Sequence, residues 1–256
     1  MRTDRDGPCV LLTATIAPAG AMPNQGAFDP RARMAQYAAA LRHYLTTSGP
    51  DWTVLFCENS GQDLAPLREV AAACCRPGRD ARFHAYRSPV PPERGKGRSE
   101  LELIDTAMRV FDDAIGASSL VWKVTGRLRV ENLGALVASA PAGTDLYADV
   151  RDVPLIGDRL GGNHWIDTRV IAFSKAGHAR FLADRWTQSW KTIEKYLYAV
   201  VTPNLAPESG IVPRFRVQPI VTGICGGSGS SYGSVGYRAK TALRATTRRV
   251  APGLWL

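Results

Sequence analysis

The stretch SLVWKVTGR at residues 119–127 decides the fold that the sequence predicts. Its apolar first half predicts a buried strand, and Gly126 predicts the turn that ends it. Two longer apolar runs precede it, CVLLTATI at 9–16 and WTVLFCENS at 52–60, with a short strand near 83–86. Helical patterns separate these strands, near 30–45, 63–75 and 99–111. Strands that alternate with helices predict an α/β fold with a mostly parallel, Rossmann-type sheet flanked by helices.

The first helix has the clearest start signal. Asp29 is a favourable N-cap, and Pro30 suits the first helical position. Beyond the fourth strand, we expect further strands near 145–149 and 169–174 and a Trp-rich helical stretch at about 175–200. The stretch 202–213 is expected to be a loop within the same domain, so all 256 residues form one domain with a basic tail at about 232–256.

The composition is that of an ordinary globular protein, with 45% hydrophobic and 21% charged residues. No apolar run approaches the roughly 18 residues of a transmembrane helix. Acidic residues precede the first apolar run, which predicts a strand rather than a secretory signal. The five cysteines form no CxxC pair, and we expect all of them to be reduced in a cytoplasmic protein.

Positive charge is concentrated at the C-terminal end. The net charge is +9, and the last 48 residues contain seven basic residues and no acidic residue after Glu208. Such local excess predicts an anionic partner that meets one face of the molecule. Nucleic acid, an anionic membrane surface and a diphosphate-bearing substrate are the candidates.

Several familiar nucleotide and hydrolase motifs are missing. No GxGxxG follows the first strand, and neither GxxxxGK[ST] nor GxSxG occurs. The Gly-rich GGSGS at 226–230 lacks the strand-to-helix context of such loops. A dinucleotide Rossmann site, a P-loop and a serine-hydrolase elbow are therefore not supported.

Polar residues gather at the carboxyl ends of the predicted strands, where open α/β sheets bind ligands. The candidate binding residues are Thr13, Thr15, Glu58, Asn59, Lys96, Gly97, Lys123, Thr125 and Arg127.

Lys123, Thr125 and Arg127 alternate with a period of two, so their side chains are expected on one face of a strand. Two cations with a hydroxyl between them would suit a diphosphate. The RGKGR loop at 94–98 leads into a helix N-terminus, which also favours an anion. A solvated basic face and a flexible basic turn are the alternative interpretations. For Glu58 and Asn59 the alternatives are contact with a base or ribose and a simple turn.

Taken in order, these segments resemble a bacterial family of GT-A-type glycosyltransferases that build O-antigen or capsular polysaccharide. The order and spacing of the matching pieces cover about 220 of the 256 residues; the pieces are LLTATI, FDPRARMAQYAAALRHYL, VLFCENSG, RGKGRSELELIDTAM, WKVTGRLRVEN, DTRVIAFSK and GGSGSSYG. The resemblance implies a GT-A-like fold, a nucleotide-sugar donor at the sheet edge and a saccharide or lipid-linked acceptor. It is not specific for either sugar.

The resemblance also bears on metal use. Better known GT-A enzymes end the corresponding strand in Asp-x-Asp, whose carboxylates hold a divalent metal. Here the position reads KVTGR at 123–127, so fixed cations stand where acids would be. We therefore expect no metal cofactor. Mg²⁺ or Mn²⁺ held by Asp145 and Asp149 is the alternative, because both would lie on one face of a strand.

Transfer with inversion needs a base that takes the acceptor proton. The candidates are Glu194, in KTIEKYLY, and Asp167, in HWIDTRVIAF, with surface carboxylates as the alternative for each. Glu194 is favoured slightly. Arg169 is a candidate for a further contact to the diphosphate or acceptor, and His164 is interpreted as a loop residue.

The tail segment YRAKTALRATTRRV has three interpretations. It could be an amphipathic helix peripheral to an anionic inner membrane, a solvated tail, or a segment that folds over the donor and lends it arginines.

Two other functions compete. A sugar nucleotidyltransferase also grips phosphates, but it normally uses Mg²⁺ and acidic ligands. A nucleic-acid-binding protein would interleave aromatic residues with cations, whereas only Tyr232, Tyr237 and Trp255 lie near the basic tail. No nucleic-acid partner is therefore expected.

Overall fold

A seven-stranded sheet forms the centre of the computed structural model, which describes residues 7–18, 29–116, 119–153, 157, 163–224, 231–251, 253 and 254. Across the sheet the strands are β10 (Ile211–Val212), β6 (Leu146–Tyr147), β9 (Val170–Phe173), β4 (Val121–Thr125), β1 (Cys9–Ala14), β2 (Trp52–Glu58) and β3 (Arg79–Ala85). Every strand pair is parallel except the two that β9 makes, with β4 and β6. The predicted α/β fold with a mostly parallel sheet is confirmed.

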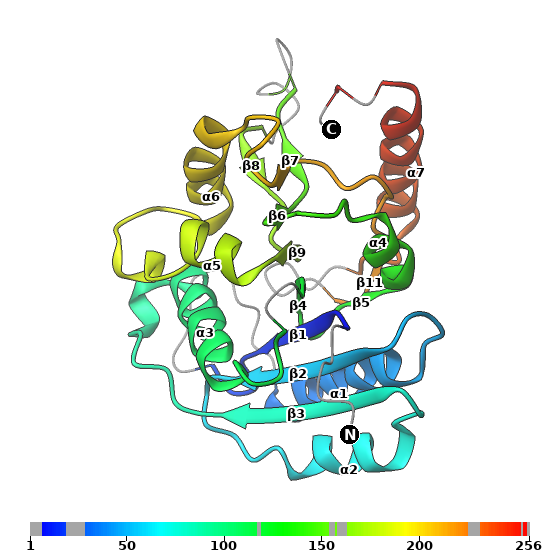
Figure 1. Ribbon diagram of the computed structural model, residues 1–256. Helices are drawn as coiled ribbons and strands as arrows, with labels where there is room; N and C mark the ends of the chain where they lie inside the picture. The colour runs from blue at the N-terminus through cyan, green and yellow to red at the C-terminus, as the bar shows by residue number, and fades with distance from the viewer. Residues whose placement is uncertain are drawn as a thin grey trace.

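Helices cover both faces of this sheet (Figure 1). They are α1 (Pro30–Thr46), α2 (Ala65–Cys74), α3 (Lys96–Val110), α4 (Leu133–Ser139), α5 (Lys175–Phe181), α6 (Ile193–Val201) and α7 (Val235–Val250). Alternate residues of β1 separate the two cores: Val10 and Leu12 pack with α1, α2 and α4, whereas Cys9 and Leu11 pack with α3, α5 and α6. Burial on both faces explains why β1 and β2 read as continuous apolar runs.

The predicted start of α1 is confirmed. The Asp29 side chain accepts a hydrogen bond from the Arg31 backbone N–H at 3.0 Å, and Pro30 occupies the first helical position. The same helix then buries Tyr37, Leu41 and Leu45 in the core.

Three segments differ from expectation. α3 begins at Lys96 instead of Ser99, so part of the basic loop forms its first turn. The stretch 175–200 is not one helix, because Asp184 adopts a left-handed conformation (φ 58°) that ends the first helical segment; α5, a short 3-10 turn at Arg185–Thr187 and α6 replace it. The expected loop at 202–213 supplies a 3-10 turn, Thr202–Asn204, and the edge strand β10.

Two small antiparallel pairs accompany the main sheet. β5 (Arg129–Val130) pairs with β11 (Val221–Thr222), and β7 (Val150–Arg151) pairs with β8 (Trp165–Ile166). Short pairs of this kind carry single side chains to defined places, and β7–β8 positions Arg151 and Trp165.

Cys9, Cys57, Cys74 and Cys75 are free thiols, as expected, while Cys225 and the GGSGS segment lie outside the described residues. Within the part of the chain that the structure describes, no helix has both the length and the apolar character needed to span a bilayer.

Candidate active site

A cavity of about 490 Å³ opens at the carboxyl ends of β1 and β4. The chain proceeds from β1 to β2 and β3 on one side, then returns to β4 on the other, and such a reversal is where open α/β sheets bind ligands. Thr13, Thr15, Thr125 and Arg127 line it, as predicted. Gly126 lets the two strand ends approach, because a Cβ there would lie 2.7 Å from the Thr13 carbonyl oxygen.

Positive charge dominates the lining of this cavity. Among the described residues, the carboxylates that line it are Glu100, Asp167 and Glu194. The basic side chains of this described lining are Arg33, Lys96, Arg127, Arg151, Arg169, Lys240 and Arg244. They come from six separate parts of the chain, so the fold itself concentrates the charge.

Arg151 is the most unusual of these cations. It is only 8% exposed, its guanidinium lies over the Trp165 ring at 4.3 Å, and its Nε has no hydrogen-bond partner among the described residues. Burial, and then the nearby charge of Arg244, lowers the pKa of Arg151 to about 10. Burial also lowers the pKa of Arg244. The carboxylates of Asp167 and Asp149 oppose part of this lowering for both side chains, and a further anion between the two desolvated guanidiniums would stabilise them more.

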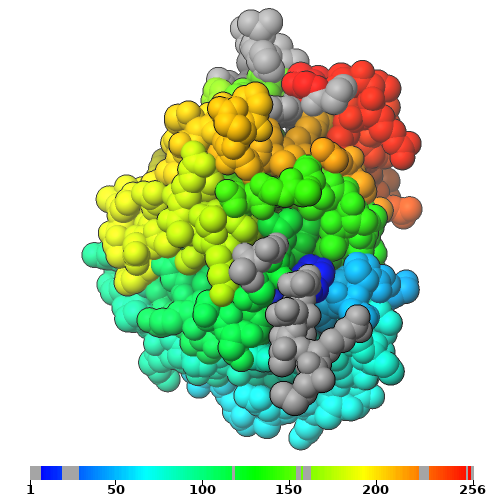
Figure 2. All heavy atoms as spheres, viewed as in Figure 1, coloured from blue at the N-terminus to red at the C-terminus, as the bar shows by residue number. Residues whose placement is uncertain are grey.

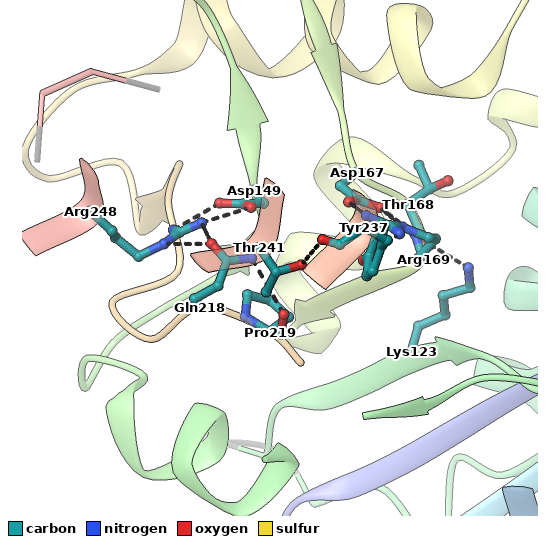
Figure 3. A network of polar contacts seen from close by, with 10 residues as sticks. All are labelled: Lys123, Asp149, Asp167, Thr168, Arg169, Gln218, Pro219, Tyr237, Thr241 and Arg248. Carbon is teal, nitrogen blue, oxygen red and sulfur yellow. Dashed lines mark hydrogen bonds and ion pairs between the residues drawn. The ribbon is translucent and has the colours of Figure 1, made fainter. Parts of the chain in front are cut away.

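Helix α7 reaches this cavity because two anchors hold it (Figure 3). Near its start, the Tyr237 hydroxyl accepts a hydrogen bond from Arg169 at 2.8 Å. Near its end, Arg248 binds both carboxylate oxygens of Asp149 at 2.9 Å, and its Nη2 also donates to Gln218. The helix between these anchors turns Lys240 and Arg244 toward the cavity. Of the three interpretations of the basic tail, its described part therefore fits the one that folds over the site.

The two candidate bases differ in their electrostatics. Asp167 accepts hydrogen bonds from Arg169 on both oxygens. Burial alone would raise the pKa of Asp167, but the charge and hydrogen bonds of Arg169 outweigh it and hold that pKa well below its usual range. Glu194 stands in the first turn of α6, and burial, with the neighbouring Glu100, raises its pKa. A carboxylate with a raised pKa is the better proton acceptor.

Lys123 lies beneath the cavity and does not line it. Its side chain is fully buried, donates to the Thr168 carbonyl oxygen at 2.6 Å and pairs with Glu100. The expected alternation is present, since the Lys123 ammonium also reaches the Thr125 hydroxyl at 3.4 Å. Its positive charge is nonetheless neutralised within the protein by Glu100.

Glu58 and Asn59 also serve the protein itself. Glu58 is fully buried and accepts hydrogen bonds from the backbone N–H groups of Ile16, Ser60 and Gln62. Asn59 accepts from the Thr15 hydroxyl at 2.7 Å and donates to Ser99. Neither residue lines the cavity, so these contacts fit the turn interpretation and hold Thr15 in place.

The two residues predicted from the basic turn, Lys96 and Gly97, have different surroundings. Lys96 lines the cavity, whereas Gly97 is buried against Trp190 and Ile193. A Cβ on Gly97 would come within 3.0 Å of both neighbours, so the glycine permits close packing of α3 on this segment.

The possible metal ligands are both engaged by protein groups. Asp145 accepts a hydrogen bond from the Ser174 hydroxyl at 2.6 Å, and Asp149 is held by Arg248. Among the described residues, no three His, Cys, Asp or Glu side chains cluster as a metal site would require. Asp145 and Asp149, the residues of the Mg²⁺ or Mn²⁺ alternative, thus both have protein partners in this structure.

Five functional candidates were not singled out from the sequence: Glu100, Arg151, Trp165, Lys240 and Arg244. The acid-free C-terminal segment was a signal for Lys240 and Arg244. His164 sits in a left-handed conformation near Asp152 and does not line the cavity, in keeping with its interpretation as a loop residue.

No protein-family model matches the chain, and no curated protein sequence does. Solved structures match at low identity. The apo WbbM bifunctional glycosyltransferase matches with a TM-score of 0.46 and 12% identity over 82% of this chain and 38% of its own. The galactosyltransferase LgtC, in complex with donor and acceptor sugar analogs, gives 0.42 and 13% over 75% and 69%. Mouse xyloside xylosyltransferase 1 gives 0.39 and 10% over 76% and 81%.

Proposed function

We propose that this chain is a glycosyltransferase that moves a sugar from a nucleotide-sugar donor to a saccharide or lipid-linked saccharide acceptor. The observation that carries the proposal is the cationic cavity at the reversal of strand order. Two of the carboxylates in its described lining already have cationic partners, since Glu100 pairs with Lys123 and Asp167 with Arg169. The remaining cations complement the diphosphate of such a donor.

The proposed step breaks the bond between the anomeric carbon and the diphosphate oxygen, and forms one from that carbon to the acceptor hydroxyl oxygen. Negative charge grows on the leaving diphosphate, where Arg127, Arg151 and Arg244 would stabilise it. The hydroxyl proton passes to Glu194, whose raised pKa suits it to accept one. This assignment applies to transfer with inversion at the anomeric carbon.

Metal independence is part of the proposal. Fixed guanidinium groups can neutralise a leaving diphosphate without a divalent ion. We expect transfer to continue in EDTA. Loss of activity in EDTA with recovery on addition of Mn²⁺ would refute metal independence.

The first experiment is a thermal-shift screen against a panel of sugar nucleotides, followed by product analysis. Release of a nucleoside diphosphate supports glycosyl transfer, whereas release of pyrophosphate would identify a nucleotidyltransferase. Salt-dependent binding of generic DNA or RNA, with no stabilisation by any sugar nucleotide, would support the nucleic-acid alternative.

Glu194→Gln tests the base. We expect turnover to fall about 10²- to 10⁴-fold while donor affinity is kept, because the amide cannot take the proton. Asp167→Asn is the matched comparison, and unchanged turnover in Glu194→Gln would move the role to Asp167. A role in O-antigen or capsular polysaccharide synthesis, on the cytoplasmic side of the inner membrane, rests on the sequence resemblance described above.

A further inference from the structure

A second cavity, of about 630 Å³, lies along α7 beside β11 and the chain that precedes it. Sites of about 300–1,000 Å³ are typical for small-molecule ligands. We call it the α7 groove. It is lined by Asn132, Arg216, Val217, Gln218, Ile220, Val221, Thr222, Tyr232, Gly233, Tyr237, Arg238, Thr241, Ala242, Ala245, Arg248 and Arg249. Figure 2 shows α7 (red) at the surface beside the orange part of the chain.

The α7 groove combines apolar walls with cations and contains no carboxylate in its described lining. Arg248 is neutralised by Asp149, but Arg216, Arg238 and Arg249 are exposed and form no salt bridge with described residues. Ile220, in the groove lining, is 48% exposed and adds open apolar surface to it. An uncompensated positive charge next to open apolar surface fits a ligand with an anionic head and a hydrocarbon body.

The groove adjoins the cationic cavity. Tyr232 and Tyr237 line both, and Tyr237 is fixed by its hydrogen bond from Arg169, in the network of Figure 3. Thr241, which lines the groove, donates to the Tyr237 carbonyl oxygen at 3.0 Å. The two cavities therefore share Tyr232 and Tyr237 as lining residues.

We propose that the α7 groove binds the hydrocarbon chain of a phosphate-bearing amphiphile, whose phosphate is attracted by the exposed guanidinium groups of the lining, Arg216, Arg238 and Arg249. Burial of the chain supplies affinity, and the guanidiniums supply selectivity for the anionic head. Binding at this groove does not depend on the proposed transfer reaction. If both hold, the acceptor saccharide is carried on this amphiphile, because its head would lie next to the cationic cavity.

The test measures binding of farnesyl phosphate to the full chain by calorimetry, below the concentration at which it forms micelles. Ala242→Trp fills the groove, and Ala239→Trp is its matched control, because Ala239 is exposed on the same helix but does not line the groove. We expect Ala242→Trp to weaken binding at least about tenfold and Ala239→Trp to leave it unchanged. Farnesol and inorganic phosphate should each bind at least about tenfold more weakly than farnesyl phosphate.

A second pair of variants removes charge from exposed positions, where folding is not at risk. Arg238→Ala combined with Arg249→Ala should weaken farnesyl phosphate binding about tenfold, whereas Arg42→Ala on α1 should not. Equal weakening by Ala239→Trp or by Leu243→Ser would place the ligand on the outer face of α7, as a bilayer contact, and overturn the groove. Binding that is lost in Arg244→Met but kept in Ala242→Trp would place it in the cationic cavity and overturn the proposal as well.

Discussion

Polar side chains are treated differently in the two parts of the molecule that meet at the cavity. In the sheet formed by β1 to β4, Glu58, Asn59 and Lys123 are all buried, and each is saturated by protein partners. In the part that follows β4, Arg151 and Arg244 are desolvated and have no salt bridge among the described residues. A buried polar group whose hydrogen-bonding and ionic partners all come from the protein stabilises the fold. A buried group without such partners lowers the stability of the fold, and a bound ligand can offset that loss.

The contrast has a physical origin in the two anchors of α7. Arg248–Asp149 and Arg169–Tyr237 hold the helix against the sheet, and the helix then places Arg244 near Arg151 regardless of their repulsion. The favourable contacts at the two anchors thus offset the unfavourable approach of Arg244 to Arg151 in the part of the helix between them. Unfolding and donor binding, measured on the same variants, distinguish buried polar residues that stabilise the fold from cavity residues that bind the donor.

The largest effect is expected for Lys123→Met. The free energy of unfolding should fall by about 3–5 kcal/mol, because Glu100 and the Thr168 carbonyl oxygen lose a buried cationic partner. Urea unfolding measures this loss, and donor affinity of the folded fraction should change little. A variant of wild-type stability that no longer binds donor would contradict this and return Lys123 to the role of a diphosphate clamp.

Arg151→Met should give the opposite profile. Donor Kd is expected to rise about thirtyfold or more, equivalent to about 2 kcal/mol, because a desolvated cation that faces the diphosphate is removed. The free energy of unfolding should not fall, since the unpaired Nε and the repulsion with Arg244 both disappear. Unfolding and donor titration of Arg129→Met, an exposed arginine outside the cavity lining, provide the control. Lower stability with unchanged Kd would place Arg151 among the structural residues.

Glu58→Gln is expected to have a smaller effect on folding than Lys123→Met. The amide nitrogen would face backbone N–H donors of the loops after β1 and β2, at a cost of about 1.5 kcal/mol in unfolding free energy. Donor Kd should stay at its wild-type value, because Glu58 does not line the cavity. A marked rise in Kd without a change in thermal stability would restore the predicted contact with a base or ribose.

The sequence predicted the features that depend on nearby residues. Strands β1, β2 and β4 follow from continuous apolar runs, and the start of α1 follows from Asp29 and Pro30. The convergence of Thr13, Thr15, Thr125 and Arg127 follows from the rule that parallel strands end at one edge.

What the sequence could not predict depends on partners far along the chain. Lys123 meets Thr168, 45 residues away, and this pairing removes it from the cavity. Arg151 gave no local signal, because its two-residue strand is defined only by pairing with β8. Gly97 suggested a phosphate loop, although its small size serves packing against Trp190.

The smallest predicted effect concerns the pH dependence of Glu194. Burial raises its pKa, Glu100 and Asp167 add to this, and Lys96 opposes it. The kcat/KM for transfer should therefore rise with pH, with a midpoint above the value of about 4.3 for an ordinary glutamate. In Glu194→Gln, the rise of kcat/KM with pH should disappear. Glu100→Gln should move the midpoint to lower pH, because a neighbouring negative charge is removed.

The same raised pKa has a consequence for stability. A carboxyl whose pKa is higher in the folded than in the unfolded state binds its proton more tightly when folded. Its contribution is present below the unfolded pKa and is lost as pH rises through the folded pKa. Glu194→Gln should thus be more stable than the wild type at neutral pH and lose that advantage in acid. Thermal unfolding across this range decides the matter: an advantage that grows as pH falls would mean that Glu194 is stabilised as a carboxylate, and would place it with the saturated residues of the sheet.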